Sequence, residues 1–188
     1  MSSDYMKKIQ SGLSVHKKIS YICKDNEPLK RNHTDMEEPL FNAHNKDEYP
    51  PAHSAEHILN GTMDKMFHCG RAFSAHVERK KSKLDYHLPA PLTEEQIKAV
   101  EDKVNEIIVS DLPVQMEIAD KSSLGERFDL SRLPDDASEK VRIVHIGDYD
   151  ECLCVGQHVE HTAQIGHFRI SSTRYQDGVQ RIVFRLDE

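Results

Sequence analysis

The stretch LTEEQIKAVEDKVNEIIV, at residues 92–109, predicts a helix more clearly than any other part of the chain. Thr93 and Gln96 have the spacing of a capping box, in which each side chain pairs with the backbone of the other residue. The apolar residues of the stretch recur at helical spacing along one face: Ile97, Val100, Val104, Ile107 and Ile108. We therefore expect an amphipathic helix that buries this face against another element.

Apolar stretches before and after this helix predict strands. PVQMEIA (113–119) and KVRIVHIG (140–147) have the length and composition of short strands. HFRISS (167–172) and VQRIVFRL (179–186) predict an antiparallel pair, and SAHVERKKSKLDYHL (74–88) predicts a hairpin with a charged turn. The fold class that follows is α+β, with an antiparallel sheet packed on two main helices.

The second of these helices is predicted by HSAEHILNGTMDKMF at residues 53–67, which carries His53 and His57 four positions apart. Four residues are about one helical turn, so both imidazoles project from the same face. Nearly a hundred residues later, CLCVGQHVEHTAQIGHF (152–168) places Cys154 and His158 at the same spacing, after a predicted strand. Zinc prefers imidazole and thiolate ligands in tetrahedral sets of four. The two half-sites together favour one zinc ion held between the helix and the loop that follows the strand.

Other interpretations of these residues stay open at this point. Each half-site alone can be a coincidence in a chain with twelve histidines. The stretch from His53 to His57 also matches H-x-x-E-H, a peptidase pattern in which Glu56 would act as a general base. That pattern needs a distant acidic ligand and leaves Cys154 and His158 without a role. Cys154 activated by His158 could instead be a nucleophile, but this leaves the helix histidines unused.

Composition and charge limit the class of protein. The 188 residues suit one domain with a small appendage, and we expect a polar N-terminal arm or small subdomain at 1–50 and the metal-binding domain at 51–188. No apolar run approaches the length of a membrane helix, and the first residues lack the apolar core of a signal peptide. Four cysteines in a chain of this length do not make a disulfide framework, so a cytoplasmic location is expected. The net charge of −7 argues against general attraction to polyanions.

Residues 52–186 resemble the editing domain shared by alanyl-tRNA synthetase, threonyl-tRNA synthetase and free-standing alanyl-tRNA editing proteins. HSAEHILNG is similar to the first metal motif of that family, and FSAHVERKKSKLDYHL is similar to the hairpin that follows it. LTEEQIKAVEDKVNEIIVSDLPV is similar to the family's helix and strand, and VRIVHIGDYDECLCVGQHVEHTAQIGHFRI to its second metal motif. The order and the spacing of the four segments agree over about 135 residues.

The resemblance implies a Zn²⁺ site formed by His53, His57, Cys154 and His158. It implies a hydrolase that acts in trans and removes serine or glycine from mischarged tRNA(Ala), with tRNA rather than DNA or a membrane as its partner. Glu56 and His76 are the candidates for proton transfer or for support of the metal ligands. Oligomeric state, monomer or homodimer, is not implied.

The resemblance also implies a substrate pocket, and here the chain departs from the family. The pocket residues would be Val155, Gly156, Gln157 and Thr162, but the alanine-type motif is C-G-G-T-H and the threonine-type motif is C-x-G-P-H. Val155 and Gln157 match neither motif. They keep open a non-catalytic or repurposed zinc protein, and also threonine-type editing of Ser-tRNA(Thr). Contacts to tRNA phosphates are expected from the basic cluster Arg79, Lys80, Lys81 and Lys83.

Overall fold

A computed structural model describes residues 49–125, 128, 130 and 139–187. The chain divides into two units, Met1–Glu37 and Glu38–Glu188. The first unit, and with it almost all of the arm expected at 1–50, lies outside the described residues. Everything that follows concerns the second unit.

The described part of the chain forms two antiparallel sheets and two α-helices, which confirms the α+β class. The four-stranded sheet has the order β1-β2-β7-β6, and the three-stranded sheet has the order β3-β4-β5. The elements follow one another as α1 (Pro50–Phe67), β1 (Ser74–His76), β2 (Ser82–His87), α2 (Glu94–Val109), β3 (Val114–Asp120), η1 (Lys121–Ser123), β4 (Lys140–Ile146), β5 (Asp150–Leu153), η3 (Thr162–Ile165), β6 (His167–Gln176) and β7 (Val179–Asp187). None of the described helices is long and apolar enough to cross a membrane.

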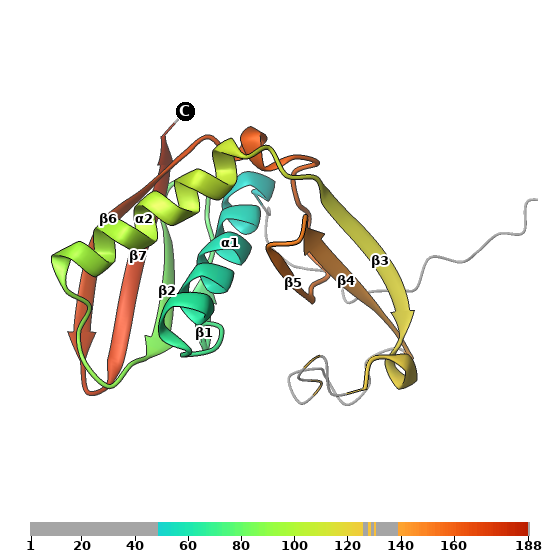
Figure 1. Cartoon of the computed structure of the whole chain (residues 1–188), viewed down its shortest axis with the longest axis horizontal. Coiled ribbons are helices and arrows are strands. Elements are labelled where there is room, and N and C mark those ends of the chain that lie inside the picture. The colour runs from blue at the N-terminus through green and yellow to red at the C-terminus, as the bar shows by residue number, and fades with distance from the viewer. Residues whose placement is uncertain (1–48, 126–127, 129, 131–138, 188) are drawn as a thin grey trace, which may run out of the picture. The chain divides into compact units, whose positions relative to one another are not determined.

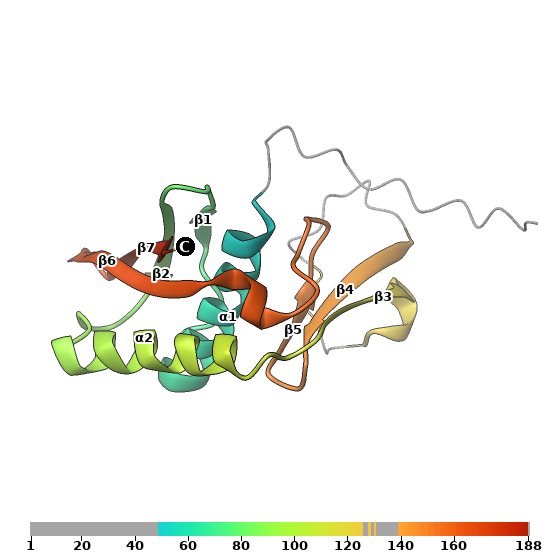
Figure 2. The same cartoon turned by 90° about the horizontal axis from the view of Figure 1, so that it is seen from above.

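The two helices pack against the four-stranded sheet, and α1 lies between that sheet and β5 (Figures 1 and 2). Their apolar faces meet the strands in one core, in which Ile58, Val104, Phe168 and Phe184 are almost fully buried. A smaller cluster under the three-stranded sheet contains Leu124, Val141 and Ile143. Helix α1 is thus held on both sides, which fixes the direction in which its histidines point.

Helix α2 begins where the sequence predicts it, whereas α1 begins at Pro50, three residues before the predicted start at His53. In α2 the Thr93 side chain accepts a hydrogen bond from the Gln96 backbone, and the Gln96 side chain accepts one from the Thr93 backbone, so the capping box is confirmed. Helix α1 starts with Pro50, whose ring fixes the φ angle that the first helical turn requires. It ends at Phe67, and the capping residue His68 has a φ of 52°.

The structure differs from the expected single sheet in one respect. Strand β4 pairs with β5, a strand that the sequence pattern does not indicate, and the two form a separate sheet with β3. The reversal between β4 and β5 occurs at Gly147, which adopts a φ of +47° that favours glycine. Strand β5 has only four residues and no apolar alternation, which explains why periodicity does not reveal it. This short strand delivers the chain to Cys154.

Asn105 joins α2 to β6 and gives a test of this packing. Its side-chain amide donates to the carbonyl of Phe168 at 2.8 Å and accepts from the amide of Phe168 at 2.9 Å. Replacing Asn105 with Ala leaves both backbone groups of Phe168 without these partners. We expect the free energy of unfolding to fall by about 2 kcal/mol, since each unsatisfied buried group costs about 1–3 kcal/mol.

Urea unfolding followed by circular dichroism measures this loss. Lys98→Ala is the matched control on the exposed side of α2, where only the ion pair to Asp102 is lost and the expected change is below about 0.5 kcal/mol. Equal effects for the two variants would contradict the role given to Asn105.

Candidate metal centre

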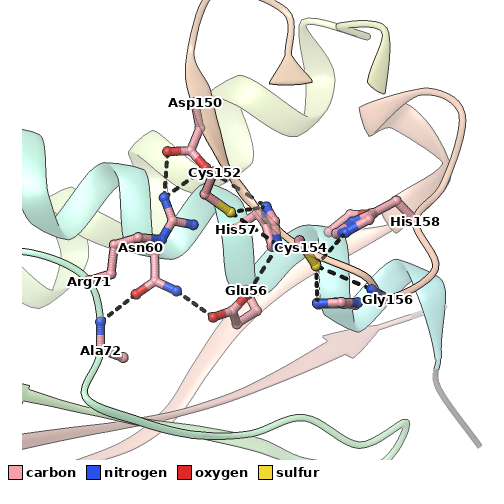
Figure 3. Close-up of polar contacts among 12 residues, drawn as sticks. Glu56, His57, Asn60, Arg71, Ala72, Asp150, Cys152, Cys154, Gly156 and His158 are labelled. Atoms are coloured by element: carbon pink, nitrogen blue, oxygen red, sulfur yellow. Dashed lines mark hydrogen bonds and ion pairs between the residues drawn. The ribbon is translucent and has the colours of Figure 1, made fainter. Parts of the chain in front are cut away.

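His53, His57, Cys154 and His158 lie together, with one potential ligand atom from each within 4.8 Å of every other. The Cys154 Sγ atom is 3.4 Å from His53 Nε2 and 3.4 Å from His158 Nε2. Figure 3 shows His57, Cys154 and His158 gathered at one point beside α1. A sulfur and a nitrogen bound to one tetrahedral zinc, at about 2.3 and 2.0 Å, lie about 3.5 Å apart. Cys154 is therefore at the separation of a shared zinc ion from both His53 and His158, and His57 lies within the 4.8 Å limit of the same group.

The second ring nitrogens of two histidines are engaged by the protein. His53 Nδ1 lies 3.1 Å from the carbonyl oxygen of Gln157, which can only accept, so Nδ1 carries the proton and Nε2 keeps its lone pair. His158 Nδ1 lies 3.1 Å from Ser54 Oγ, which also accepts a hydrogen bond from the Val159 amide. Such hydrogen bonds orient metal-binding histidines and fix their tautomer. In both residues Nε2 is the atom turned toward Cys154.

Electrostatics favour the forms of these residues that bind metal. Burial lowers the pKa of His158 to about 3, helped by His53 and Arg142. Burial also holds the pKa of His57 well below its usual range. Both imidazoles are thus neutral at pH 7, as a metal ligand must be. The Gly156 amide donates to Cys154 Sγ at 3.4 Å, and such a contact favours the thiolate.

The loop that carries Cys154 and His158 is pinned to β4 and to α1. Arg142 donates through Nε to the carbonyl of Cys154 at 2.7 Å and through Nη2 to the carbonyl of Gly156. Ser54, fully buried in α1, contacts the other end of the loop through His158 and Val159. The sequence does not single out Ser54 or Arg142, because neither occupies one of the metal-ligand positions of the two motifs.

Glu56 lies beside the metal ligands, as its place in the sequence suggests. Its Oε2 atom is 3.7 Å from His57 Nε2, and its Oε1 atom accepts a hydrogen bond from Asn60. Asn60 also accepts from the Ala72 amide at 2.8 Å, so it connects Glu56 to the chain after α1. Burial raises the pKa of Glu56 to about 7, against the opposing effect of Arg71.

Three residues that sequence reasoning missed complete the surroundings of His57. Arg71 donates from Nη1 to both carboxylate oxygens of Asp150, at 2.8 and 3.0 Å. Asp150 packs so closely on α1 that a Cβ added at Gly61 would lie 2.9 Å from its Oδ1 atom. Cys152 Sγ lies 3.3 Å from His57 Nδ1 (Figure 3). Of these three residues, only Cys152 has a sequence signal, which is its C-x-C spacing with Cys154.

The metal centre opens into a cleft of about 1230 Å³. His53, His57 and Cys154 line it, together with Phe73 and His87, whose rings stack with centroids 4.1 Å apart. Phe73 is 45% exposed although its ring stacks on His87. The cleft therefore offers a metal-binding group and an aromatic surface in the same cavity.

Other residues expected at the site do not line this cleft. His76 is in β1, where its Nε2 atom pairs with Glu78 at 2.6 Å, and it does not line the cleft. Val155, Gly156 and Gln157 are in the loop between two metal ligands but do not line the cleft either. Val155 and Gln157 are exposed and Gly156 is buried.

Thr162 is fully buried rather than placed at a pocket wall. Its hydroxyl contacts the carbonyls of Ile107 and Ile108 at the end of α2 and accepts from the Leu112 amide at 2.9 Å. These contacts give Thr162 a structural role that joins η3 to α2.

The basic residues Arg79, Lys80, Lys81 and Lys83 are exposed, in the turn between β1 and β2 and at the start of β2. Arg79 lies over the ring of Tyr49, with its guanidinium carbon 5.0 Å from the ring centroid. Because Tyr49 directly precedes α1, this turn lies close to the end of α1 that carries His53.

Comparison with known proteins gives a consistent result. Residues 141–183 match the family model of the "Threonyl and Alanyl tRNA synthetase second additional domain". Alanine–tRNA ligases from Lawsonia intracellularis, Bdellovibrio bacteriovorus and Halorubrum lacusprofundi are 36%, 34% and 32% identical to this chain over 137, 133 and 136 residues. These alignments cover 69–70% of the chain and 15% of each ligase. The chain thus corresponds to a small part of the length of these relatives.

Metal binding should stabilise the fold, because the ligands come from α1 and from the loop after β5. We expect zinc to raise the free energy of unfolding by about 2.7 kcal/mol when free zinc exceeds Kd about 100-fold. Cys154→Ala should abolish most of this gain, whereas Cys69→Ala, a half-buried cysteine outside the four-residue group, should retain it. Urea unfolding with zinc and with a chelator measures the difference, and an equal gain in both variants would contradict the site.

The structural role of Thr162 can be separated from substrate binding. Thr162→Val keeps the shape of the side chain but leaves the Leu112 amide without its partner, so we expect a loss of about 1–3 kcal/mol in stability. Zinc stoichiometry, measured on the same folded sample, should not change. An unchanged stability together with altered substrate selectivity would restore the pocket role.

Proposed function

This chain is an editing-domain-like relative of the alanyl-tRNA synthetases, and we propose that it is a zinc-dependent hydrolase that deacylates mischarged tRNA(Ala). The reaction cleaves the ester between the amino acid and the 3′ ribose, and serine or glycine is the amino acid removed. The chain would act in trans, on tRNA charged by a separate enzyme. We assign this activity to the domain at residues 51–188 and expect it in the cytoplasm.

The single observation that supports this most directly is the convergence of His53, His57, Cys154 and His158 at the cleft. Three imidazoles and one thiolate are a donor set that zinc prefers. A bound zinc ion would supply a fixed positive charge that attracts the substrate or polarises its ester. The protein's own contribution is to hold these four ligands through contacts such as His53–Gln157 and His158–Ser54.

The rest of the cleft suits the end of a charged tRNA. Phe73 presents a partly exposed ring, and nucleic-acid bases stack on such rings without regard to sequence. Lys80 and Lys81 lie in the turn next to the start of α1, where they can contact phosphates. A local contact of this kind is compatible with the net charge of −7. Glu56 lies next to His57 and is placed to support that ligand.

The loop residues Val155 and Gln157 bear on which ester is cleaved. Both are exposed beside the metal ligands, so they can contact a substrate that reaches the loop. Val155 and Gln157 match neither the alanine-type nor the threonine-type motif. Threonine-type editing of Ser-tRNA(Thr) is therefore the second candidate function. The third is a protein that binds zinc but cleaves no ester.

A metallopeptidase based on H-x-x-E-H has less support. Cys154 lies 3.4 Å from His53 Nε2 and completes a four-donor group without an acidic ligand. In addition, the Oε1 atom of Glu56 already accepts a hydrogen bond from Asn60.

Deacylation assays test the proposal. We expect the full chain with bound zinc to release serine or glycine from tRNA(Ala), and to leave Ala-tRNA(Ala) intact. His57→Ala should reduce the rate at least about 100-fold, the scale on which loss of a metal's support acts. His145→Ala is the matched control, because His145 lines the same cleft but lies outside the four-residue group.

The same assay on Ser-tRNA(Thr) separates the two editing types. Release from Ser-tRNA(Thr) alone would assign the threonine type. Stoichiometric zinc without release from any of these substrates would contradict a deacylase and leave a zinc-binding protein.

A further inference from the structure

The four-stranded sheet is exposed on one face of β6 and β7. In β7 the side chains of Gln180, Ile182 and Phe184 are buried in the core, and the side chains between them point the other way. Helix α2 packs along the buried face and lies on one side of β6 in Figure 2. The outer side of these strands is therefore a surface rather than part of the core.

Basic side chains gather on this surface. Two arginines of β6 lie directly opposite two arginines of β7, Arg169 with Arg185 and Arg174 with Arg181. Lys83 of β2 lies between the two pairs along the strands. These five side chains are called the outer basic face below. Like charges directly opposite each other on neighbouring strands destabilise a sheet, so this arrangement does not serve the fold.

Two carboxylates offset only part of this charge. Arg181 donates to both carboxylate oxygens of Asp85 at 2.7 Å, and Arg169 donates from Nε to Asp187 at 3.1 Å. Each arginine pair thus keeps one charge that is not neutralised, on a chain whose net charge is −7. The other members of the outer basic face form no ion pair with a carboxylate in the part of the chain that the structure describes: Lys83, Arg174 and Arg185.

The outer basic face is continuous with the proposed site at both ends of β2. Lys83 is the second residue of this strand and follows the basic turn that contains Lys80 and Lys81. At the other end of the strand, His87 lines the cleft and stacks on Phe73. Lys83 and His87 are four positions apart in one strand, so they lie on the same face of the sheet. A nucleic acid whose end lies in the cleft can therefore follow β2 onto the outer basic face.

We propose that the outer basic face binds the phosphate backbone of the tRNA whose 3′ end enters the cleft. This inference rests on the proposed function and adds a contact surface on β6 and β7 that neither the metal motifs nor the basic turn contains. Arginine suits the role, because its guanidinium can donate two parallel hydrogen bonds to one phosphate. Between the arginine pairs lie the short side chains of Ser172 and Val183, which let a backbone approach the strands closely. Contacts to phosphates add affinity without reading the base sequence.

The salt dependence of binding to tRNA(Ala) that carries no amino acid tests the proposal. The full chain with bound zinc is compared with Arg174→Gln/Arg185→Gln, a double variant in which both side chains are exposed. Each lost phosphate contact reduces the slope of log K against log salt concentration by about one. We therefore expect a slope smaller by about two and an affinity roughly 10-fold weaker.

The matched control is Lys98→Gln/Lys103→Gln, which removes the same charge from α2, where both lysines pair with carboxylates of the helix. Its slope and affinity should equal those of the wild type. Lys83→Gln gives an independent measurement from β2 and should reduce the slope by about one. If both variants of the outer basic face bind tRNA as the control does, the proposal is wrong.

These results are separate from those of the deacylation assay. No ester is cleaved in the binding experiment, so the expected loss of affinity in a chain without deacylation refutes only the deacylase. A wild-type chain that binds no tRNA overturns both proposals. Vesicles that contain phosphatidylserine are the second probe. Binding to these vesicles that requires Arg174 and Arg185, without binding of tRNA, would assign the outer basic face to a membrane and overturn the proposal.

Discussion

The close approach of the loop after β5 to helix α1 is the constraint on which the site depends. Each element supplies two of the four clustered donors, and neither can form the group alone. Hydrogen bonds from His53 to Gln157 and from the Val159 amide to Ser54 hold the two elements together across 104 and 105 positions of sequence. Both sheets help to form this contact. The four-stranded sheet supports α1, and the three-stranded sheet carries the loop after β5.

The polar groups behind the ligands form a connected set rather than isolated contacts. Asn60 joins Glu56 to the chain after α1, and Arg71 joins that chain segment to Asp150 at the start of β5. Burying charged and polar groups is costly unless they are paired, so this set fixes relative positions as much as it adds stability. The side chains around His57 are therefore held by partners on three different elements.

Much of this arrangement can be predicted from the sequence. The capping box and the apolar stripe predict helix α2, and the spacing of His53 with His57 and of Cys154 with His158 indicates two half-sites. Periodicity does not reveal β5, since four residues with mixed polarity carry no pattern, and for the same reason it does not reveal the division into two sheets. The sequence places Thr162 near the substrate pocket because it follows the second metal motif, whereas the structure buries its side chain against the end of α2, a contact that no sequence pattern indicates.

The identity and ligands of the metal are the central claim, and X-ray absorption at the zinc edge of the purified full chain tests it most directly. The account predicts one zinc per chain with sulfur at about 2.3 Å and nitrogen at about 2.0 Å in a four-coordinate shell. The single sulfur corresponds to Cys154 of the four-residue group. A shell of oxygen and nitrogen without sulfur, or no bound metal, would contradict the account.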